Sequence, residues 1–380
     1  MPLWECCDDM PCLAIIVGLY MRNESPHMNA HFSPLRLAAV LLGICAIPTL
    51  ADDAPEPPSP VAAKPAAKPS APPTKPPSES ELRATITKGL GFLAKEGEAW
   101  MAAKDCNGCH HLPEMLWSHR EAKLRGFDVD QEKFDEWLAW ADERKENFKP
   151  GTEMVALLKL ALPDRPAPEL TKTIVADQQA DGSWKPAAQF TGQKRGDDAQ
   201  ANSTRIFLLA LATPDAAAPE AEAARVKAAA FLAKKDTPAS IESLVFRTLY
   251  ARRTGATADA DAARTQILKL QRGDGGWSYV IGENMSDAHG TGQALLALQP
   301  DAADAKTAEA IARAQHWLVK TQREDGSWSS DFTRISKRDR SAPDNAKSFK
   351  DATMIYTYFG SGWATIGLLQ SVPLKPGAVK

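Results

Sequence analysis

The chain has 380 residues, of which 44% are hydrophobic and 24% are charged, so it holds enough apolar material for one large core or two ordinary ones. Its 45 Lys and Arg residues against 48 Asp and Glu residues give a formal net charge of −3. This balance excludes the basic footprint of a nucleic-acid-binding domain and gives no support to a polybasic membrane surface.

The first residues, 1–51, are typical of an export signal rather than of a folded domain. The apolar segment 37–47 follows a basic residue, is too short to span a bilayer as a helix, and leads to small residues at Ala51. Met28 is the predicted start, because the extension before it places acidic residues ahead of any basic one. We predict cleavage after Ala51, a periplasmic or extracellular location, and no transmembrane helix in the mature chain.

A spacer precedes the folded part of the chain. Residues 52–79 are rich in Pro, Ala and Lys, a composition that cannot form a packed core and favours a semi-extended, disordered linker. The remaining residues, 80–374, are predicted to form one helical repeat domain.

Only two of the 6 cysteines follow Ala51, and both lie in the sequence Cys106-Asn-Gly-Cys109-His110. This CxxCH pattern resembles the haem-attachment motif of c-type cytochromes. Two thiols at this spacing reach the two vinyl groups of one porphyrin edge, and the next residue supplies an axial imidazole to the iron. The resemblance implies a covalent haem c, with His110 as its axial ligand.

The motif leaves alternatives open. A zinc site is not favoured, because it usually needs four ligands and no second Cys pair exists, whereas a structural CxxC disulfide stays possible. The second axial ligand is also open, since the iron would be either five-coordinate or held by a distal side chain. The candidate distal ligands are Met154, His119 and His111.

Periodic apolar runs separated by Gly, Pro, Asp and Asn stop signals predict helices throughout the domain and no strands. The runs cover 80–103, 111–125, 130–148, 151–162, 168–180, 199–212, 218–234, 238–253, 259–271, 287–298, 304–321 and 351–370. Six hairpins of this kind suit an all-α (α/α)6 toroid, with odd-numbered helices outside and even-numbered helices inside.

Three segments of the form Gln-x-x-x-Gly-x-Trp recur at the ends of outer runs, and Arg313–Trp328 carries the longest version. The pattern resembles the QW repeat of the squalene–hopene cyclase, oxidosqualene cyclase and prenyltransferase superfamily. That resemblance covers roughly 80–374 and implies the toroid, with Gln and Trp tying successive outer helices together. The residues concerned are Gln178, Gly182 and Trp184, then Gln271, Gly275 and Trp277, then Gln322, Gly326 and Trp328.

The activities of that superfamily are not supported by the sequence. The acidic Asp-x-Asp-Asp motif of its cyclases is missing, since Asp197-Asp198 is more simply a helix cap, and no cysteine follows Cys109 to complete a prenyltransferase zinc site. The enzyme question therefore stays open.

The alternation of outer and inner helices places the loops 104–110, 181–198, 272–286 and 322–350 at one end of the toroid. The CxxCH motif and the starts of the inner helices share that end. Polar and aromatic residues there are candidates for lining a central cavity: Trp117, Asp198, Asn202, Asp287, His289, Thr291, Asp351 and Tyr356.

The leading prediction is an exported haem-bearing toroid that serves electron transfer or haem-based ligand binding, with a redox partner protein. One alternative is a squalene-cyclase-like or prenyltransferase-like enzyme, or a protein that binds an isoprenoid or other apolar small molecule. The other is a structural repeat protein whose CxxC forms a disulfide.

Overall fold

The computed structural model describes residues 75–104, 111–143, 153–186, 198–235, 237–329 and 343–378, all within one compact unit. The predicted signal region and nearly all of the predicted spacer lie outside the described residues. So do Cys106, Cys109 and His110. The side chains of 343–352 are likewise not described.

The described residues form twelve α-helices and two short 3-10 helices, with isolated bridges but no strand. The helices of one set bury nearly all their sides. They are α2 (Leu112–Leu124), α4 (Glu153–Ala161), α7 (Asp198–Ala210), α9 (Ile241–Arg253), α11 (Ala288–Leu298) and α14 (Pro343–Leu369). The helices of the other set alternate with them along the chain. They are α1 (Glu79–Lys104), α3 (Gln131–Glu143), α5 (Pro168–Ala176), α8 (Pro219–Leu232), α10 (Thr257–Lys269) and α12 (Ala305–Thr321).

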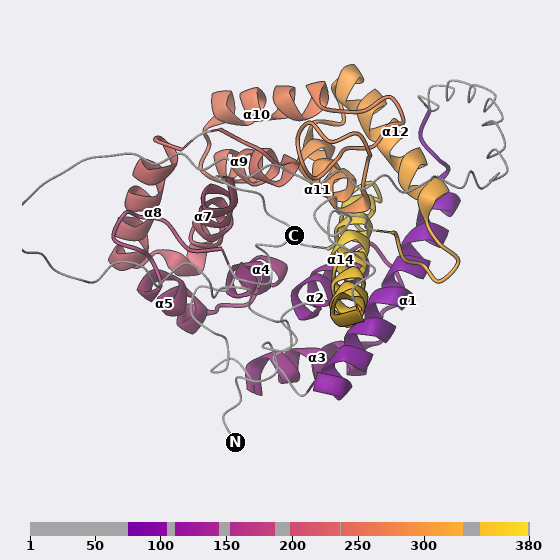
Figure 1. Ribbon diagram of the computed structural model, residues 1–380, viewed down its shortest axis with the longest axis horizontal. Coiled ribbons are helices and arrows are strands. Elements are labelled where there is room, and N and C mark those ends of the chain that lie inside the picture. The colour runs from indigo at the N-terminus through magenta and orange to yellow at the C-terminus, as the bar shows by residue number, and fades with distance from the viewer. Residues whose placement is uncertain are drawn as a thin grey trace, which may run out of the picture. The chain divides into compact units, whose positions relative to one another are not determined.

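The first set forms a closed inner ring and the second set surrounds it (Figure 1). Around the ring α2 packs on α4, α4 on α7, α7 on α9, α9 on α11, α11 on α14, and α14 on α2. The predicted all-α (α/α)6 toroid is therefore confirmed, and so is its alternation: counted along the chain, the first and every second helix after it lie outside, and the others lie inside.

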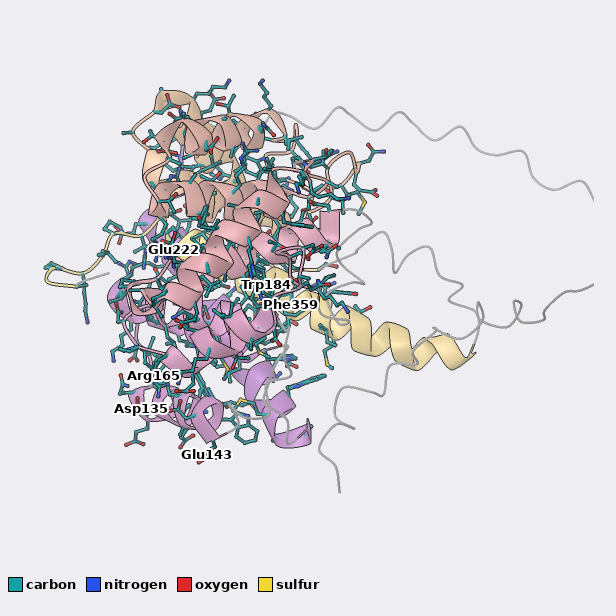
Figure 2. All side chains as sticks on the ribbon, turned by 90° about the vertical axis from the view of Figure 1, so that its left-hand side faces the viewer. Asp135, Glu143, Arg165, Trp184, Glu222 and Phe359 are labelled. Atoms are coloured by element: carbon teal, nitrogen blue, oxygen red, sulfur yellow. The ribbon has the colours of Figure 1, made fainter. Side chains whose placement is uncertain are left out.

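The sequence explains which helix lies where. In α4 and α11 every residue is buried, because their apolar and small side chains leave no polar face for solvent. In α3 and α10 the buried residues are three per helix and recur at helical spacing, so each helix has one apolar stripe and one solvated face. Figure 2 shows the solvated side, where exposed Asp135 and Glu143 of α3 lie at the edge of the body.

The glutamines of the three repeats join neighbouring outer helices. The side-chain amide of Gln271 donates to the carbonyl oxygen of Gly275 in its own turn (2.8 Å) and to that of Ala310 in α12 (2.7 Å). Gln178 bonds Ala224 of α8 in the same way, and Gln322 bonds Thr85 of α1. This last bond links the final outer helix to the first.

The tryptophans of the same segments are anchored inside their own hairpin. The indole N–H of Trp277 donates to the carbonyl of Ile267 in α10 (2.7 Å), and that of Trp328 donates to Leu318 in α12 (2.9 Å). Both rings are at most 1% exposed. The glutamine therefore makes the hydrogen bond between outer helices, while the tryptophan fixes the loop to the helix that precedes it. We call these three segments the Gln-Gly-Trp hairpins.

Several predicted helix ends were wrong. The helix predicted over 168–180 ends at Ala176, because the chain turns at Asp177 to bring Gln178 to its neighbour's carbonyl. The helix predicted from 351 begins at Pro343, a residue whose fixed φ suits a first helical position. The end predicted at 148 for the third helix falls outside the described residues. Within the described residues no helix is both long enough and apolar enough to cross a bilayer.

Candidate functional site

Acidic side chains lie at the N-terminal ends of five inner helices. These ends lie at the end of the toroid where the chain passes from each outer helix to the next inner helix. Glu114, Glu153, Asp198 and Glu242 are buried, and Asp287 is the half-buried N-cap of α11. Free backbone N–H groups and the positive end of the helix dipole favour a carboxylate at such positions. We call these five residues the acidic inner ring.

Glu242 is the best-bonded member of the acidic inner ring. Its carboxylate accepts hydrogen bonds from Asn202 Nδ2 (2.5 Å), the Tyr279 hydroxyl (3.0 Å) and Gln293 Nε2 (3.0 Å). His289 Nε2 lies 3.7 Å from the same carboxylate. Burial, followed by the charge of Glu242, raises the pKa of Tyr279 well above its usual value, so this phenol stays a donor.

Asp198 and Asp287 are also held by the fold. Ser240 Oγ donates to Asp198 Oδ2 (2.8 Å) and accepts from Asn202 Nδ2 (3.2 Å), which joins Asp198 to the Glu242 network. Asp287 caps α11 by accepting from the backbone N–H of Gly290 (2.7 Å), and its other oxygen accepts from that of Tyr279 (2.5 Å). Burial raises the pKa of Asp198 and of Asp287.

Glu114 differs from the other acids. Its side chain is 2% exposed, and within the described part of the chain neither carboxyl oxygen receives a hydrogen bond from another residue. Burial raises its pKa to about 8, and the charge of Glu242 on α9 adds to that effect. Glu114 is therefore a neutral carboxylic acid at pH 7, and no other described residue forms a hydrogen bond with its carboxyl.

Gly362 of α14 makes room for this acid. A Cβ at that position would lie 2.8 Å from Glu114 Cβ and 2.9 Å from Glu114 Cγ. The charge of Glu114 acts on the buried phenol of Tyr358, also on α14. The side chain of Glu114 therefore packs against α14, the neighbour of α2 in the inner ring.

Three aromatic side chains meet in the ring interior. The ring centroid of Trp363 on α14 lies 5.5 Å from that of Trp117 on α2 and 6.2 Å from that of Phe246 on α9. It also lies 6.1 Å from the imidazole of His289, which it stacks against. We call Trp117, Phe246 and Trp363 the aromatic centre.

The structure gathers several of the residues predicted to line a central cavity. Asn202 and His289 meet at Glu242, Asp198 joins them through Ser240, and Trp117 belongs to the aromatic centre.

The remaining candidates have other contacts where their side chains are described. Thr291 Oγ1 accepts from the backbone N–H of Trp277 (2.9 Å), so it fixes a Gln-Gly-Trp hairpin to α11. Tyr356 packs with Tyr279 and Phe359, and the side chain of Asp351 is not described.

The candidate distal haem ligands occupy separate environments. The His111 ring stacks on Trp100 (4.6 Å between centroids) and lies 3.9 Å from that of Tyr358. His119 bonds the Met115 carbonyl through Nδ1 (2.8 Å), and burial lowers its pKa to about 4, so it is neutral at pH 7. Met154 is fully buried in the first turn of α4.

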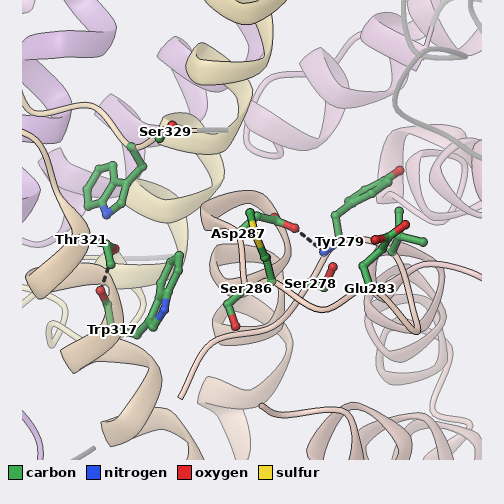
Figure 3. Close-up of a pocket in the computed structure, with 11 residues that line it drawn as sticks. Ser278, Tyr279, Glu283, Ser286, Asp287, Trp317, Thr321 and Ser329 are labelled. Atoms are coloured by element: carbon green, nitrogen blue, oxygen red, sulfur yellow. Dashed lines mark hydrogen bonds between the residues drawn. The ribbon is translucent and has the colours of Figure 1, made fainter. Parts of the chain in front are cut away.

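A rim pocket of about 230 Å³ opens between the loop after α10 and the end of α12 (Figure 3). Trp317 and Ser329 stand on one side of it, and Tyr279, Glu283 and Asp287 on the other. Trp328 also lines the pocket. Asp287 turns its carboxylate to the backbone of Tyr279, so this acid serves the loop. Among the described residues no group of three or more His, Cys, Asp or Glu side chains is arranged to hold a metal ion.

Glu114, Glu242 and Trp363 were missed by sequence reasoning. Glu114 and Glu242 each lie in the first turn of a largely buried helix, an unusual place for a glutamate, and that signal could have found them. Trp363 has no local signal, since its role depends on reaching across the ring to α2 and α9.

Comparison with known proteins finds similarity in structure alone. No family model and no curated protein matches the chain. Among solved structures, a type II terpene cyclase from Scytonema in complex with geranylgeranyl dihydroxybenzoate is similar at a TM-score of 0.47 and 14% sequence identity, over 76% of this chain and 98% of that one.

Proposed function

We propose that this chain is an exported toroid protein that carries one covalent haem c and uses it in electron transfer or in binding a small ligand at the iron. The observation that carries the proposal is the CxxCH motif of Cys106, Cys109 and His110, in a chain with no other cysteine after Ala51. The motif falls between the end of α1 at Lys104 and the start of α2 at Leu112. A redox partner would therefore meet the haem at the loop end of the toroid.

The described residues next to the motif fit such a group. His111, the residue after the axial ligand, is 1% exposed and packed between Trp100 and Tyr358. Tyr358 is itself fixed by donating to the Leu93 carbonyl of α1 (2.9 Å). These contacts anchor the carboxyl end of the attachment segment and put aromatic surface beside it. A bound haem would supply a one-electron redox centre there, with Cys106 and Cys109 holding it and His110 on its iron.

Absorption and mass measurements test the proposal. The protein, produced in a host with haem c maturation machinery, is expected to show a Soret band that stays with the chain after denaturation. The Cys106→Ser/Cys109→Ser variant should lose the covalent haem and keep its helical circular dichroism, because the Gln-Gly-Trp hairpins hold the fold. A wild-type chain without covalent haem, whose mass instead shows an internal disulfide, would establish the structural CxxC reading.

A second candidate, an enzyme or binding protein for an apolar small molecule of the isoprenoid kind, is favoured by one observation. The neutral acid Glu114 lies one helical turn before Trp117, and the aromatic centre presents π faces of the type that stabilise cationic or apolar ligands. Incubation with a linear C20 isoprenoid, followed by extraction and mass spectrometry, tests it. Unchanged isoprenoid and no saturable binding would eliminate this candidate without affecting the haem proposal.

A further inference from the structure

The buried carboxyl of Glu114 receives no hydrogen bond from any other residue in the ranges that the structure describes. Buried polar groups in folded proteins are nearly always paired, so an acid with two unbonded oxygens needs a specific explanation. The other acids of the acidic inner ring do not share this condition. Ser203 Oγ donates to Glu153, and donors to Asp198, Glu242 and Asp287 have been given above.

We propose that the ring interior binds an alkylammonium ligand, whose primary ammonium head donates to Glu114 and whose apolar chain lies along the aromatic centre. The inference deepens the second candidate function, since it names the ligand class, and it does not depend on the haem. A primary ammonium carries three N–H donors and a positive charge. It can therefore both donate hydrogen bonds to the Glu114 carboxyl and neutralise its negative charge.

The surroundings of Glu114 favour a cation over a neutral donor. The negative charge of Glu242 on α9 also raises the pKa of Glu114, so a cation placed at Glu114 is attracted by both acids. The other ionisable group that acts here is the phenol of Tyr358 on α14, whose pKa is held well above its usual value mainly by burial. The phenol is therefore neutral at pH 8 and does not compete with a cationic ligand for Glu114.

The aromatic centre favours an apolar chain on that head. Trp117 lies on the same helix as Glu114, one turn further along, and Trp363 follows directly after Gly362, the glycine that faces the acid. Indole faces attract cations and bury alkyl groups with little loss of side-chain entropy. Head and chain would thus be recognised by adjoining parts of α2 and α14.

Three probes of matched chain length test the proposal on the full exported protein, with tryptophan fluorescence and calorimetry at pH 8. Hexylammonium has charge and N–H donors, hexyltrimethylammonium has charge without donors, and hexanol has a donor without charge. We expect saturable binding of one hexylammonium per chain, at least ten-fold tighter than either other probe.

Variants locate the site. Glu114→Gln should weaken hexylammonium binding at least ten-fold, and Glu114→Met, which has a similar shape and no charge, provides the same test if the amide variant fails to fold. Glu309→Gln, which removes an exposed acid of α12, should bind as the wild type does. Three results would each overturn the proposal: hexanol binding as tightly as hexylammonium, both Glu114 variants binding hexylammonium as tightly as the wild type, or no binding of any probe. Haem absorption, measured in the same samples, reports separately on the first proposed function.

Discussion

The Gln-Gly-Trp hairpins and the acidic inner ring lie at the same end of the toroid and differ in how their polar groups are used. In each hairpin a glutamine donates twice and an indole donates once, and the three copies have the same partners at equivalent positions. In the ring no two acids have the same partners, and Glu114 receives no hydrogen bond from the described residues.

The Gln-Gly-Trp hairpins repeat the same hydrogen bonds, whereas the acids of the acidic inner ring each have different partners. This difference indicates different roles. A contact that recurs in several hairpins is one that any repeat needs in order to pack on the next, so it reports on the fold. A side chain that is buried at a cost, with different partners in each helix, is not required by the repeat. The acidic inner ring is therefore the better place to look for function.

The largest expected effect comes from emptying a hairpin. Trp328→Ala removes a fully buried indole and its bond to Leu318, and should lower the free energy of unfolding by roughly 3–5 kcal/mol in urea titrations. Trp317→Ala, which truncates a half-buried indole on the preceding helix, is the matched control and should cost clearly less. Equal losses of stability would mean that Trp328 contributes no more to the packing of its hairpin than Trp317 does.

The close approach of neighbouring outer helices can be isolated at glycines. Gly275 has a φ of +98°, and a Cβ there would lie 2.7 Å from the Arg313 carbonyl oxygen of α12. Gly255 has a φ of +76° with nothing within 4 Å of such a Cβ. Gly255→Ala should therefore cost only the backbone strain of about 1 kcal/mol, and Gly275→Ala roughly 2–3 kcal/mol, in thermal and urea unfolding. Similar losses at the two sites would exclude a steric role for Arg313.

This contrast also separates what the sequence could predict from what it could not. The twelve helices, their alternation and the left-handed Asp-Gly turn follow from local periodicity and glycine chemistry, and the positive φ of Gly182, Gly275 and Gly326 confirms the turn. The steric need for glycine at these positions could not be predicted from the local sequence. It arises because each glycine packs against the backbone of the next outer helix, which is far away in the chain.

The same limit applies inside the ring. Asp198, Asn202 and His289 were predicted as pocket residues from their places at helix starts. Asn202 and His289 do meet at one carboxylate, and Asp198 is joined to Asn202 through Ser240. That carboxylate, Glu242, was missed, since its neighbours come from α7, α11 and the loop after α10. Separations of this size along the chain leave no local pattern to read.

The unpartnered acid should give the protein an unusual pH dependence. Because the folded-state pKa of Glu114 is about 8, above its value near 4.3 in an unfolded chain, the folded state binds the extra proton between these values. Its contribution to stability is complete below pH 4 and is lost as the pH rises toward 8. Wild type should lose about 2 kcal/mol relative to Glu114→Gln between pH 6.5 and pH 8.

Urea titrations at the two pH values measure this difference. His119, whose pKa falls to about 4 on folding, has an effect of the opposite sign, with stability rising with pH mainly below 6.5. Its effect is the same in wild type and variant, so it cancels in the comparison. Parallel curves for wild type and Glu114→Gln would show that the acid is ionised in the folded state and already has a partner.

The smallest expected effect concerns ring closure. Gln322 donates to the Thr85 carbonyl of α1 (2.9 Å), while Gln271 makes the equivalent bond between two helices that follow each other along the chain. Gln322→Ala and Gln271→Ala should each cost about 1–2 kcal/mol, the net value of two amide hydrogen bonds, against no change for exposed Gln266→Ala. Only Gln322→Ala should speed amide hydrogen exchange in α1, because α1 begins the domain and is tied to α12 by this bond. Equal exchange in α1 for both variants would mean that packing on α14, rather than the glutamine bond, closes the toroid.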